Sequence, residues 1–300
     1  MGELVTLSLG AGVQSTTLAL LAVEGVLPRP DVAIFADTGW EPRAVYGHLD
    51  RLTAAMAAAE IPVVRVSRGN LREDMLAGRD WLSIPAFVTT KGGEAVPVRR
   101  QCTGDYKLDP IIRYLKLRLG AKVSASGAVL PPPAGSAVEQ WIGFSADEIG
   151  RVKPSQHKWI TNRYPLLDLT GAGGREGWTR DDCRRWLTSK GWGDTPRSAC
   201  IGCPLHGNAA WRRLRDQHPD EWADAVDFDA ALRTSNVRSG AGTAYLHRSL
   251  LPLAQAPIDR VTRREWNDRQ ADIFDFLEDG DPDGCSPYGC RSGLPIDAAS

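Results

Sequence analysis

The first 66 residues alternate short apolar runs with longer helical segments. Residues 4–9 form an apolar run rich in strand-forming side chains, and residues 15–24 continue as an apolar helical stretch. A second run at residues 31–36 precedes an alanine-rich helix over residues 41–59, and residues 61–66 form a third strand. Strands that alternate with helices in this way pair in parallel, so the order predicts a doubly wound α/β sheet with helices on both faces.

Later segments extend this pattern. Residues 138–144 predict another strand, and residues 179–191 predict a helix that begins near a capping box and ends at a glycine. The irregular stretch over residues 68–109 is typical of an active-site loop. We therefore predict a first domain over residues 1–205 and a smaller, mostly helical C-terminal region over residues 206–300.

The composition and charge exclude several classes of protein. The 300 residues carry 36 Lys and Arg against 37 Asp and Glu, so no overall positive field predicts nucleic-acid binding. The N-terminus lacks the features of a signal peptide, and no apolar run reaches the length of a membrane span. We expect a cytoplasmic protein with no membrane partner.

A glycine turn at residues 10–12 follows the first strand and opens the first helix. Backbone N–H groups at such a position, with the positive end of the helix, can hold a phosphate or pyrophosphate. The turn is also a near miss to a dinucleotide fingerprint with Asp37 as the ribose-binding acid, but Ser15 and Thr38 count against that interpretation. A glycine turn that only packs the helix on the strand is the simplest alternative.

The turn resembles a known nucleotide-binding loop. Ser8-Leu9-Gly10-Ala11-Gly12-Val13-Gln14-Ser15 is similar to the PP-loop of ATP pyrophosphatases, in the variant of the phosphoadenylylsulfate (PAPS) reductase-like branch, with Gln14 where the usual form has Asp. Phe35-Ala36-Asp37-Thr38-Gly39 resembles the segment after the second strand in that branch. Further matches follow in order at Cys102-Thr103 with Lys107 and Pro110, at Gly143 through Glu148 with Arg151, at Pro165-Leu166, and at residues 198–204.

The resemblance covers Ser8 to Pro204 and implies a fold and a site. The implied fold is of the adenine nucleotide alpha hydrolase-like (HUP) type, and residues 1–205 become the PP-loop nucleotide-binding domain. ATP would be bound with Mg²⁺, and Asp37 or Glu148 would hold the Mg²⁺ or the ribose. The implied binding residues are Ser8, Gly10, Gly12, Gln14, Ser15, Asp37, Thr38, Gly143 and Glu148. The implied catalytic residues are Ser15, Lys107 and Arg151, the last two stabilising phosphate charge.

Six cysteines in a chain with cytosolic features suggest metal ligands or reactive thiols. Cys200 and Cys203 form a C-x-x-C pair that can reach one metal, and Cys102 could supply a third thiolate. The resemblance implies a [4Fe–4S] cluster on these three residues, with Zn²⁺, a redox pair, a persulfide carrier or inert thiols as alternatives. Cys285 and Cys290 could add a fourth ligand or relay sulfur, or be an incidental exposed pair.

The combined motifs most resemble the sulfurtransferase of bacterial DNA phosphorothioation systems. They predict an ATP pyrophosphatase that adenylylates an acceptor, a DNA backbone phosphate, for sulfur insertion. The expected partners are ATP, DNA, a cysteine desulfurase as sulfur donor and other proteins of the modification system. Alternatives are a reductase of adenylylated sulfate, a transfer-RNA thiolase, and an adenine-nucleotide-binding module without turnover. Residues 211–215 could follow a nucleic-acid backbone or form one face of a surface helix.

Overall fold

The computed structural model describes residues 4–78, 82–89, 92–234 and 242–261. These residues form two compact units. The described part of the first unit comprises residues 4–68 and 103–198, and that of the second comprises residues 69–78, 82–89, 92–102, 199–234 and 242–261. The sequence predicted a single boundary at residue 205. In the structure, residues 69–78, 82–89 and 92–102 belong to the same unit as the helices that follow residue 205.

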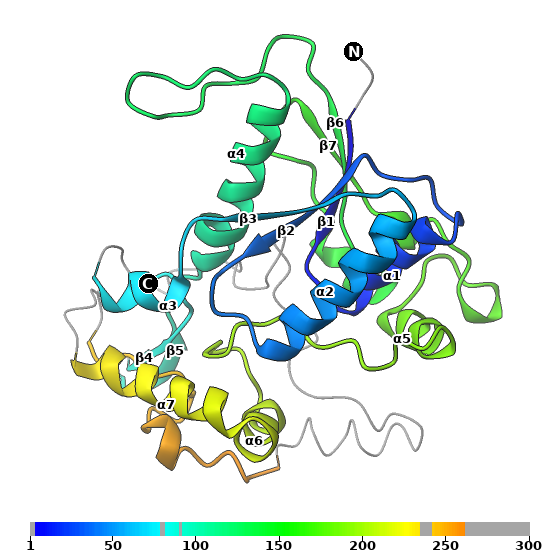
Figure 1. Ribbon diagram of the computed structural model, residues 1–300. Coiled ribbons are helices and arrows are strands. Elements are labelled where there is room, and N and C mark those ends of the chain that lie inside the picture. The colour runs from blue at the N-terminus through cyan, green and yellow to red at the C-terminus, as the bar shows by residue number, and fades with distance from the viewer. Residues whose placement is uncertain (1–3, 79–81, 90–91, 235–241, 262–300) are drawn as a thin grey trace. The chain divides into compact units, whose positions relative to one another are not determined.

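The first unit is built on a parallel sheet of five strands in the order β3-β2-β1-β6-β7 (Figure 1). Leu7 at the centre pairs with Ala33 on one side and with Trp141 on the other. This arrangement confirms the predicted α/β fold. The strands are β1 Leu4–Leu9, β2 Val32–Asp37, β3 Val63–Ser67, β6 Val138–Trp141 and β7 Ile160–Arg163.

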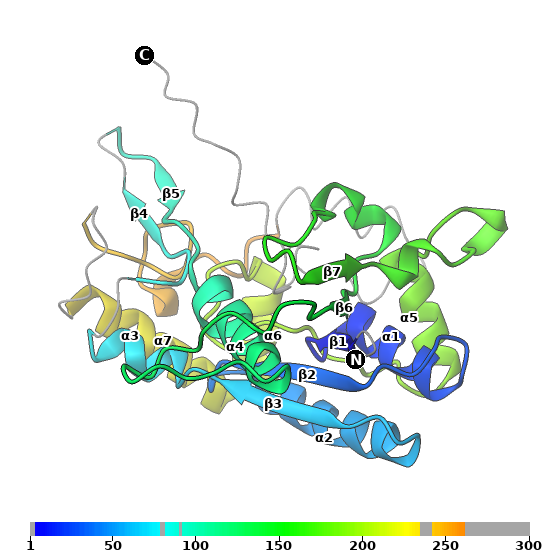
Figure 2. The same ribbon diagram turned by 90° about the horizontal axis from the view of Figure 1, so that it is seen from above.

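Helices cover both faces of this sheet (Figure 2). Ala33 and Phe35 of β2 join one apolar cluster with α1, α2 and α5, whereas Val32 and Ile34 join a second cluster with α4. Successive residues of a strand point to opposite faces, so β2 is apolar throughout because both faces are covered. The helices are α1 Val13–Val23, α2 Arg43–Ala58, α4 Asp109–Arg118 and α5 Arg180–Ser189.

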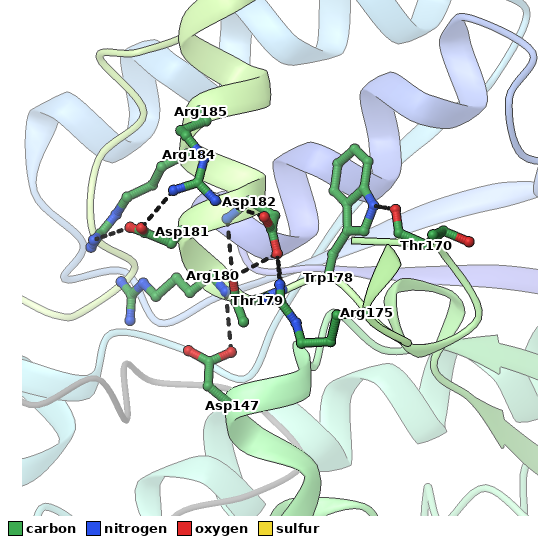
Figure 3. Close-up of polar contacts among 10 residues, drawn as sticks. All are labelled: Asp147, Thr170, Arg175, Trp178, Thr179, Arg180, Asp181, Asp182, Arg184 and Arg185. Atoms are coloured by element: carbon green, nitrogen blue, oxygen red, sulfur yellow. Dashed lines mark hydrogen bonds and ion pairs between the residues drawn. The ribbon is translucent and has the colours of Figure 1, made fainter. Parts of the chain in front are cut away.

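The start of α5 confirms the predicted cap. The Asp182 backbone N–H donates to Thr179 Oγ1 at 3.2 Å, and the Thr179 backbone N–H donates to Asp182 Oδ2 at 2.8 Å. Arg175 and Arg185 add ion pairs to the same carboxylate (Figure 3). Burial alone would raise the pKa of Asp182, but the bonds from Thr179 and Arg185 and the charge of Arg175 lower it to about 2.

The second unit contains a hairpin and helices. The sequence predicted an irregular loop over residues 68–109, whereas part of this stretch forms α3 and the antiparallel pair β4 and β5. Arg72 of α3 forms an ion pair with Asp224 of α7 at 2.8 Å, and Phe87 of β4 bridges to Tyr245. Tertiary partners far along the chain therefore order this stretch. The elements are α3 Leu71–Leu76, β4 Phe87–Thr89, β5 Ala95–Pro97, α6 Asn208–Gln217 and α7 Pro219–Thr234.

Short helical turns complete both units. A π-helical turn, η1 Gly104–Leu108, leads directly into α4, where Pro110 occupies the first turn as predicted. The 3₁₀ turns are η2 Ala146–Arg151, η3 Pro165–Leu167, η4 Ala172–Gly174 and η5 Leu253–Gln255. Within the described ranges, no helix has the length and apolarity needed to cross a membrane.

Candidate functional site

The glycine turn brings two backbone amides onto one oxygen. The N–H groups of Gly10 and Gly12 donate to Ser15 Oγ at 3.2 and 3.3 Å, and this hydroxyl donates to the Gly12 carbonyl oxygen at 3.2 Å. Ala11 between them is fully buried with a φ of 54°, in the left-handed region. Successive amides that converge in this way form a concave site for an anion. Ser15 therefore closes the turn at the point where a phosphate oxygen would be received.

The start of α1 adds further donors to the turn. The first bond inside the helix runs from Thr16 N–H to the Gly12 carbonyl at 2.9 Å. The N–H groups of Val13, Gln14 and Ser15 therefore precede the first position that has an acceptor within the helix. Because the helix dipole is also positive at this end, the turn favours a negatively charged ligand.

Two segments far along the chain press against the turn. A Cβ added at Gly143 would lie 3.0 Å from Ser15 N and 3.1 Å from the Gln14 carbonyl carbon. A Cβ added at Gly12 would lie 3.1 Å from Ser198 Cβ. A side chain at either position would therefore force its neighbours to shift by a few tenths of an ångström. Ser198 was not among the predicted site residues, although it opens the matched segment 198–204 and could have been included on that ground.

Gln14 connects the turn to the η2 segment. Its Nε2 donates to Glu148 Oε2 at 2.8 Å and to Ser145 Oγ at 3.4 Å. Ser145 Oγ also donates to Glu148 Oε2 at 3.3 Å. An amide can donate to the Glu148 carboxylate, whereas the Asp of the usual loop would place a second negative charge beside it. This contact gives a physical reason for the departure from the usual loop.

Neighbouring side chains of the same protein occupy the Glu148 carboxylate. Burial raises its pKa, against the opposing effect of the charge of Arg151, with which it forms an ion pair. The Arg151 guanidinium lies 4.6 Å from the centroid of the Phe144 ring. With donors from Gln14, Ser145 and Arg151 already on it, Glu148 fits poorly as a Mg²⁺ ligand. Glu148 and Arg151 instead hold the loop after β6 against the glycine turn.

A second polar group follows β2. Asp37 Oδ1 accepts from the Gly39 N–H at 2.7 Å and from the Tyr46 hydroxyl at 2.8 Å. The pKa of Tyr46 is raised by burial first, and then by the hydrogen bond to Asp37 and its charge. Asp37 itself is partly exposed, so of the two predicted acids it is the better fit for Mg²⁺ or ribose.

Lys107 belongs to this second group through an acid that the sequence analysis missed. Glu41 Oε1 accepts from Thr38 Oγ1 at 3.1 Å and lies 3.6 Å from Lys107 Nζ. Both Glu41 and Lys107 are buried, which makes the pair costly to break. Glu41 directly precedes the Pro42 that opens α2, and the acid could have been noticed for its position after the matched Asp37-Thr38-Gly39.

Both groups lie at the carboxyl ends of neighbouring strands. The chain builds β2 and β3 on one side of β1 and later adds β6 and β7 on the other side, so the strand order reverses at β1. Ligands of open α/β sheets bind at such a reversal. Ser8, the residue before the end of β1, is buried, and its hydroxyl has no hydrogen-bond partner within the described part of the chain.

The three predicted cluster cysteines lie in the second unit. Cys102 N–H donates to the Ser83 carbonyl at 2.8 Å, and Cys203 N–H closes a turn on the Cys200 carbonyl at 3.1 Å. His206 Nε2 donates to that same carbonyl at 3.0 Å. Over the described ranges, no group of three or more His, Cys, Asp or Glu side chains is arranged to hold a metal ion. This arrangement gives no support to a three-cysteine cluster, which stays a prediction. No step of the reaction proposed below uses such a cluster.

The remaining cysteines and the aromatic stretch have simpler roles. Cys183 is fully buried in the core of the first unit, and burial raises the pKa of its thiol to about 12, so it is unreactive packing. Cys285 and Cys290 lie outside the described residues. Trp211 is fully buried against the His206 ring, and Arg215 is paired with Asp259, so residues 211–215 offer no exposed aromatic platform.

Comparisons with known proteins give a structural likeness and no match in sequence. No protein-family model matches the chain, and no curated protein matches it in sequence. Among solved structures, the chain is similar to the phosphoadenylyl-sulfate (PAPS) reductase from Candida auris in its phosphate complex, with a TM-score of 0.39 and 13% identity. The likeness covers 64% of this chain and 74% of that one. A likeness of this extent adds nothing on function to the residues described above.

Proposed function

We propose that the first unit binds ATP at the glycine turn and uses it to adenylylate an acceptor oxygen, with release of pyrophosphate. The observation that supports this proposal is the convergence of the Gly10 and Gly12 amides on one oxygen at the start of α1. Hydrogen bonds of 3.2 and 3.3 Å to a neutral hydroxyl are weaker than those to an anionic oxygen. A phosphate oxygen would therefore compete favourably with Ser15 for the same two donors.

The chain's own groups would stabilise the charge that develops on phosphate. Amides fixed before the reaction need no reorganisation as negative charge moves onto the leaving pyrophosphate. Asp37 would hold the Mg²⁺ that neutralises part of this charge. Lys107, held by Glu41, would supply a positive charge near the carboxyl end of β2. The acceptor oxygen attacks the α-phosphorus, and the bond to the β-phosphate oxygen breaks.

The proposed acceptor is a DNA backbone phosphate that is activated for sulfur insertion. This part rests on the matched segments between Ser8 and Pro204, which resemble phosphorothioation sulfurtransferases. A cysteine desulfurase would supply the sulfur, and other modification-system proteins would assist. Attack of the persulfide's terminal sulfur on phosphorus would displace AMP and leave a P–S–S linkage, which a cellular thiol, as two-electron reductant, would cleave to give the phosphorothioate. Aligned reactants account for much of the acceleration in such transfers.

Pyrophosphate release by the full chain tests the proposal. Purified protein is incubated with ATP, Mg²⁺ and duplex DNA, and pyrophosphate and AMP are measured. Pyrophosphate release that depends on DNA is expected, whereas AMP should stay on the DNA phosphate because this incubation contains no sulfur donor. A reductase of adenylylated sulfate would release no pyrophosphate, and a binding module would retain ATP uncleaved; either result contradicts the proposal. Anaerobic purification with an iron and zinc assay tests the predicted cluster separately.

A matched pair of serine variants assigns the activity to the turn. Ser15→Ala removes a hydroxyl that can donate to the phosphate once the phosphate oxygen has replaced it on the two amides, so turnover should fall by roughly 100- to 1,000-fold, as for loss of one anion-stabilising donor. Ser189→Ala removes a hydroxyl at the end of α5 that donates to the Trp186 carbonyl, and turnover should be unchanged. Equal activity of both variants would count against the glycine turn as the site.

A further inference from the structure

The second unit contains a cavity that is separate from the nucleotide site. Its volume is about 360 Å³, within the range of small-molecule sites. Ser249, His247 and Asn208 contribute to its lining, together with the exposed side chains of Arg248 and Arg260. The residues that line this space thus include a serine, a histidine and two arginines.

The hydrogen bonds of these residues assign the tautomer of the His247 ring, whose Nδ1 also accepts from the Ser249 backbone N–H at 3.1 Å. Asn208 Nδ2 donates to the carbonyls of Pro257 and Arg260 at 3.2 and 2.7 Å, so Asn208 Oδ1 must be the acceptor for His247 Nε2 at 3.1 Å. His247 Nε2 therefore carries the ring proton, and Nδ1 is left as an acceptor. The Ser249 hydroxyl, 2.8 Å from Nδ1, donates its proton to the ring.

The surrounding fold holds this relay in place. Asp229 of α7 is buried and accepts from the N–H groups of Leu246 and Leu253, which fixes the segment that carries His247. Leu250, directly after Ser249, has a φ of 55°, a conformation that residues with a Cβ rarely adopt. Burial lowers the pKa of His247 to about 4, so the ring is neutral near pH 7.

We propose that Ser249 is the nucleophile of a second active site, which hydrolyses esters of acids that carry a further negative charge. A hydroxyl that donates to a neutral imidazole, which a third group orients, is the arrangement of nucleophilic catalysis. Arg248 and Arg260 are placed to bind the anionic group of the substrate. Asn208 acts as a positioning residue for the imidazole.

The reaction is balanced by water alone. Ser249 Oγ bonds to the ester carbonyl carbon, its proton moves to His247 Nδ1, and the ester C–O bond breaks as the leaving alcohol takes that proton. Water then attacks the acyl-serine, again giving a proton to Nδ1, which returns it to Ser249 as the acid leaves. Acid and alcohol are the products, and no oxidant or reductant is required.

A fluorophosphonate probe tests the nucleophile on the intact chain without ATP. Attack by Ser249 Oγ forms a bond to phosphorus and releases fluoride, and peptide mass mapping locates the adduct. We expect label at Ser249 and none at the control residue Ser126. Ser126 is exposed, and its hydroxyl lies 2.9 Å from the Ser124 hydroxyl rather than beside an imidazole. Folded protein that takes no label at Ser249, or labels both serines equally, overturns the proposal.

Variants of His247 and Arg260 distinguish a catalytic site from a turn with only a structural role. His247→Gln keeps a side chain that can accept the hydroxyl hydrogen bond but cannot take the proton, so labelling should slow by about 100-fold. An unchanged labelling rate overturns the role of His247. The p-nitrophenyl monoester of succinic acid should be hydrolysed faster than p-nitrophenyl acetate, and Arg260→Gln should reduce that preference by roughly tenfold. Equal rates for the two esters overturn the assigned substrate class.

Discussion

Replacement of Gly143 by Ala tests the close contact between the loop after β6 and the glycine turn. The new Cβ would meet Ser15 N at 3.0 Å, the Gln14 carbonyl carbon at 3.1 Å and Gln14 Cβ at 3.2 Å. Ordinary contacts begin at 3.4 Å, so the shortest must lengthen by 3.4 − 3.0 = 0.4 Å. Two of the three atoms are backbone at the start of α1, so relief requires movement of the turn itself.

The expected cost follows from this geometry. Insertion of a methyl group into a tightly packed site costs about 1–3 kcal/mol. The midpoint of thermal unfolding should therefore fall by roughly 2–12 °C, at about 2–4 °C for each kcal/mol. Because the displaced atoms belong to the proposed phosphate site, ATP binding should weaken by roughly tenfold, given that a misplacement of about 1 Å can cost 100-fold.

The assay combines thermal unfolding with ATP titration of the same samples. Gly47→Ala is the matched control, since a Cβ at this exposed position of α2 meets nothing within 4 Å. That variant should be more stable by about 0.5–1 kcal/mol, because alanine favours the helix, and should bind ATP normally. A Gly143→Ala protein that melts and binds ATP like the wild type would refute the reasoning.

Four further predictions concern single contacts. Gln14→Glu places a second carboxylate on Glu148 and raises the folded-state pKa of the pair, so urea unfolding at pH 7 should show a loss of about 1–3 kcal/mol that shrinks at pH 5. Thr179→Ala removes the cap of α5 and should cost about 1 kcal/mol by urea unfolding. Because the pKa of Asp182 is lowered to about 2 from 3.8, its contribution is present above pH 4 and lost as pH falls to 2, so wild-type stability measured by urea unfolding should decline over that range. Lys107→Met removes the positive charge beside the buried Glu41 carboxylate and should cost about 3–5 kcal/mol in the same assay.

The sheet of the first unit could be predicted because its strands have a strong local signal. Most residues of β1 and β2 are buried on both faces, so their sequences are largely apolar between turn residues. The Ile160–Arg163 strand was missed because it is short, lies at the edge of the sheet and buries only its first residue. Likewise, α3 and the β4–β5 hairpin depend on partners such as Asp224 and Tyr245, which a local pattern cannot reveal.

The candidate site was predictable in its residues but not in their connections. The glycine turn, Gly143 and Glu148 were identified, and the structure brings them together. The sequence analysis predicts a role on phosphate for Arg151, and this stays a prediction; in the structure its guanidinium is paired with Glu148 and lies 4.6 Å from the centroid of the Phe144 ring. Glu41 and Ser198 lie beside or within matched segments, but their contacts with Lys107 and Gly12, which are distant in the chain, are visible only in the structure.

The hydrogen bond between Gln14 and Glu148 has a consequence for the evolution of this chain. The two residues are 134 positions apart, yet a carboxylate at either one sets what the other can be. Related proteins that carry an acid at position 14 should therefore lack the acid at position 148. The exchange should pass through an intermediate with an uncharged residue at both positions. Covariation of this pair across related genomes would record that constraint.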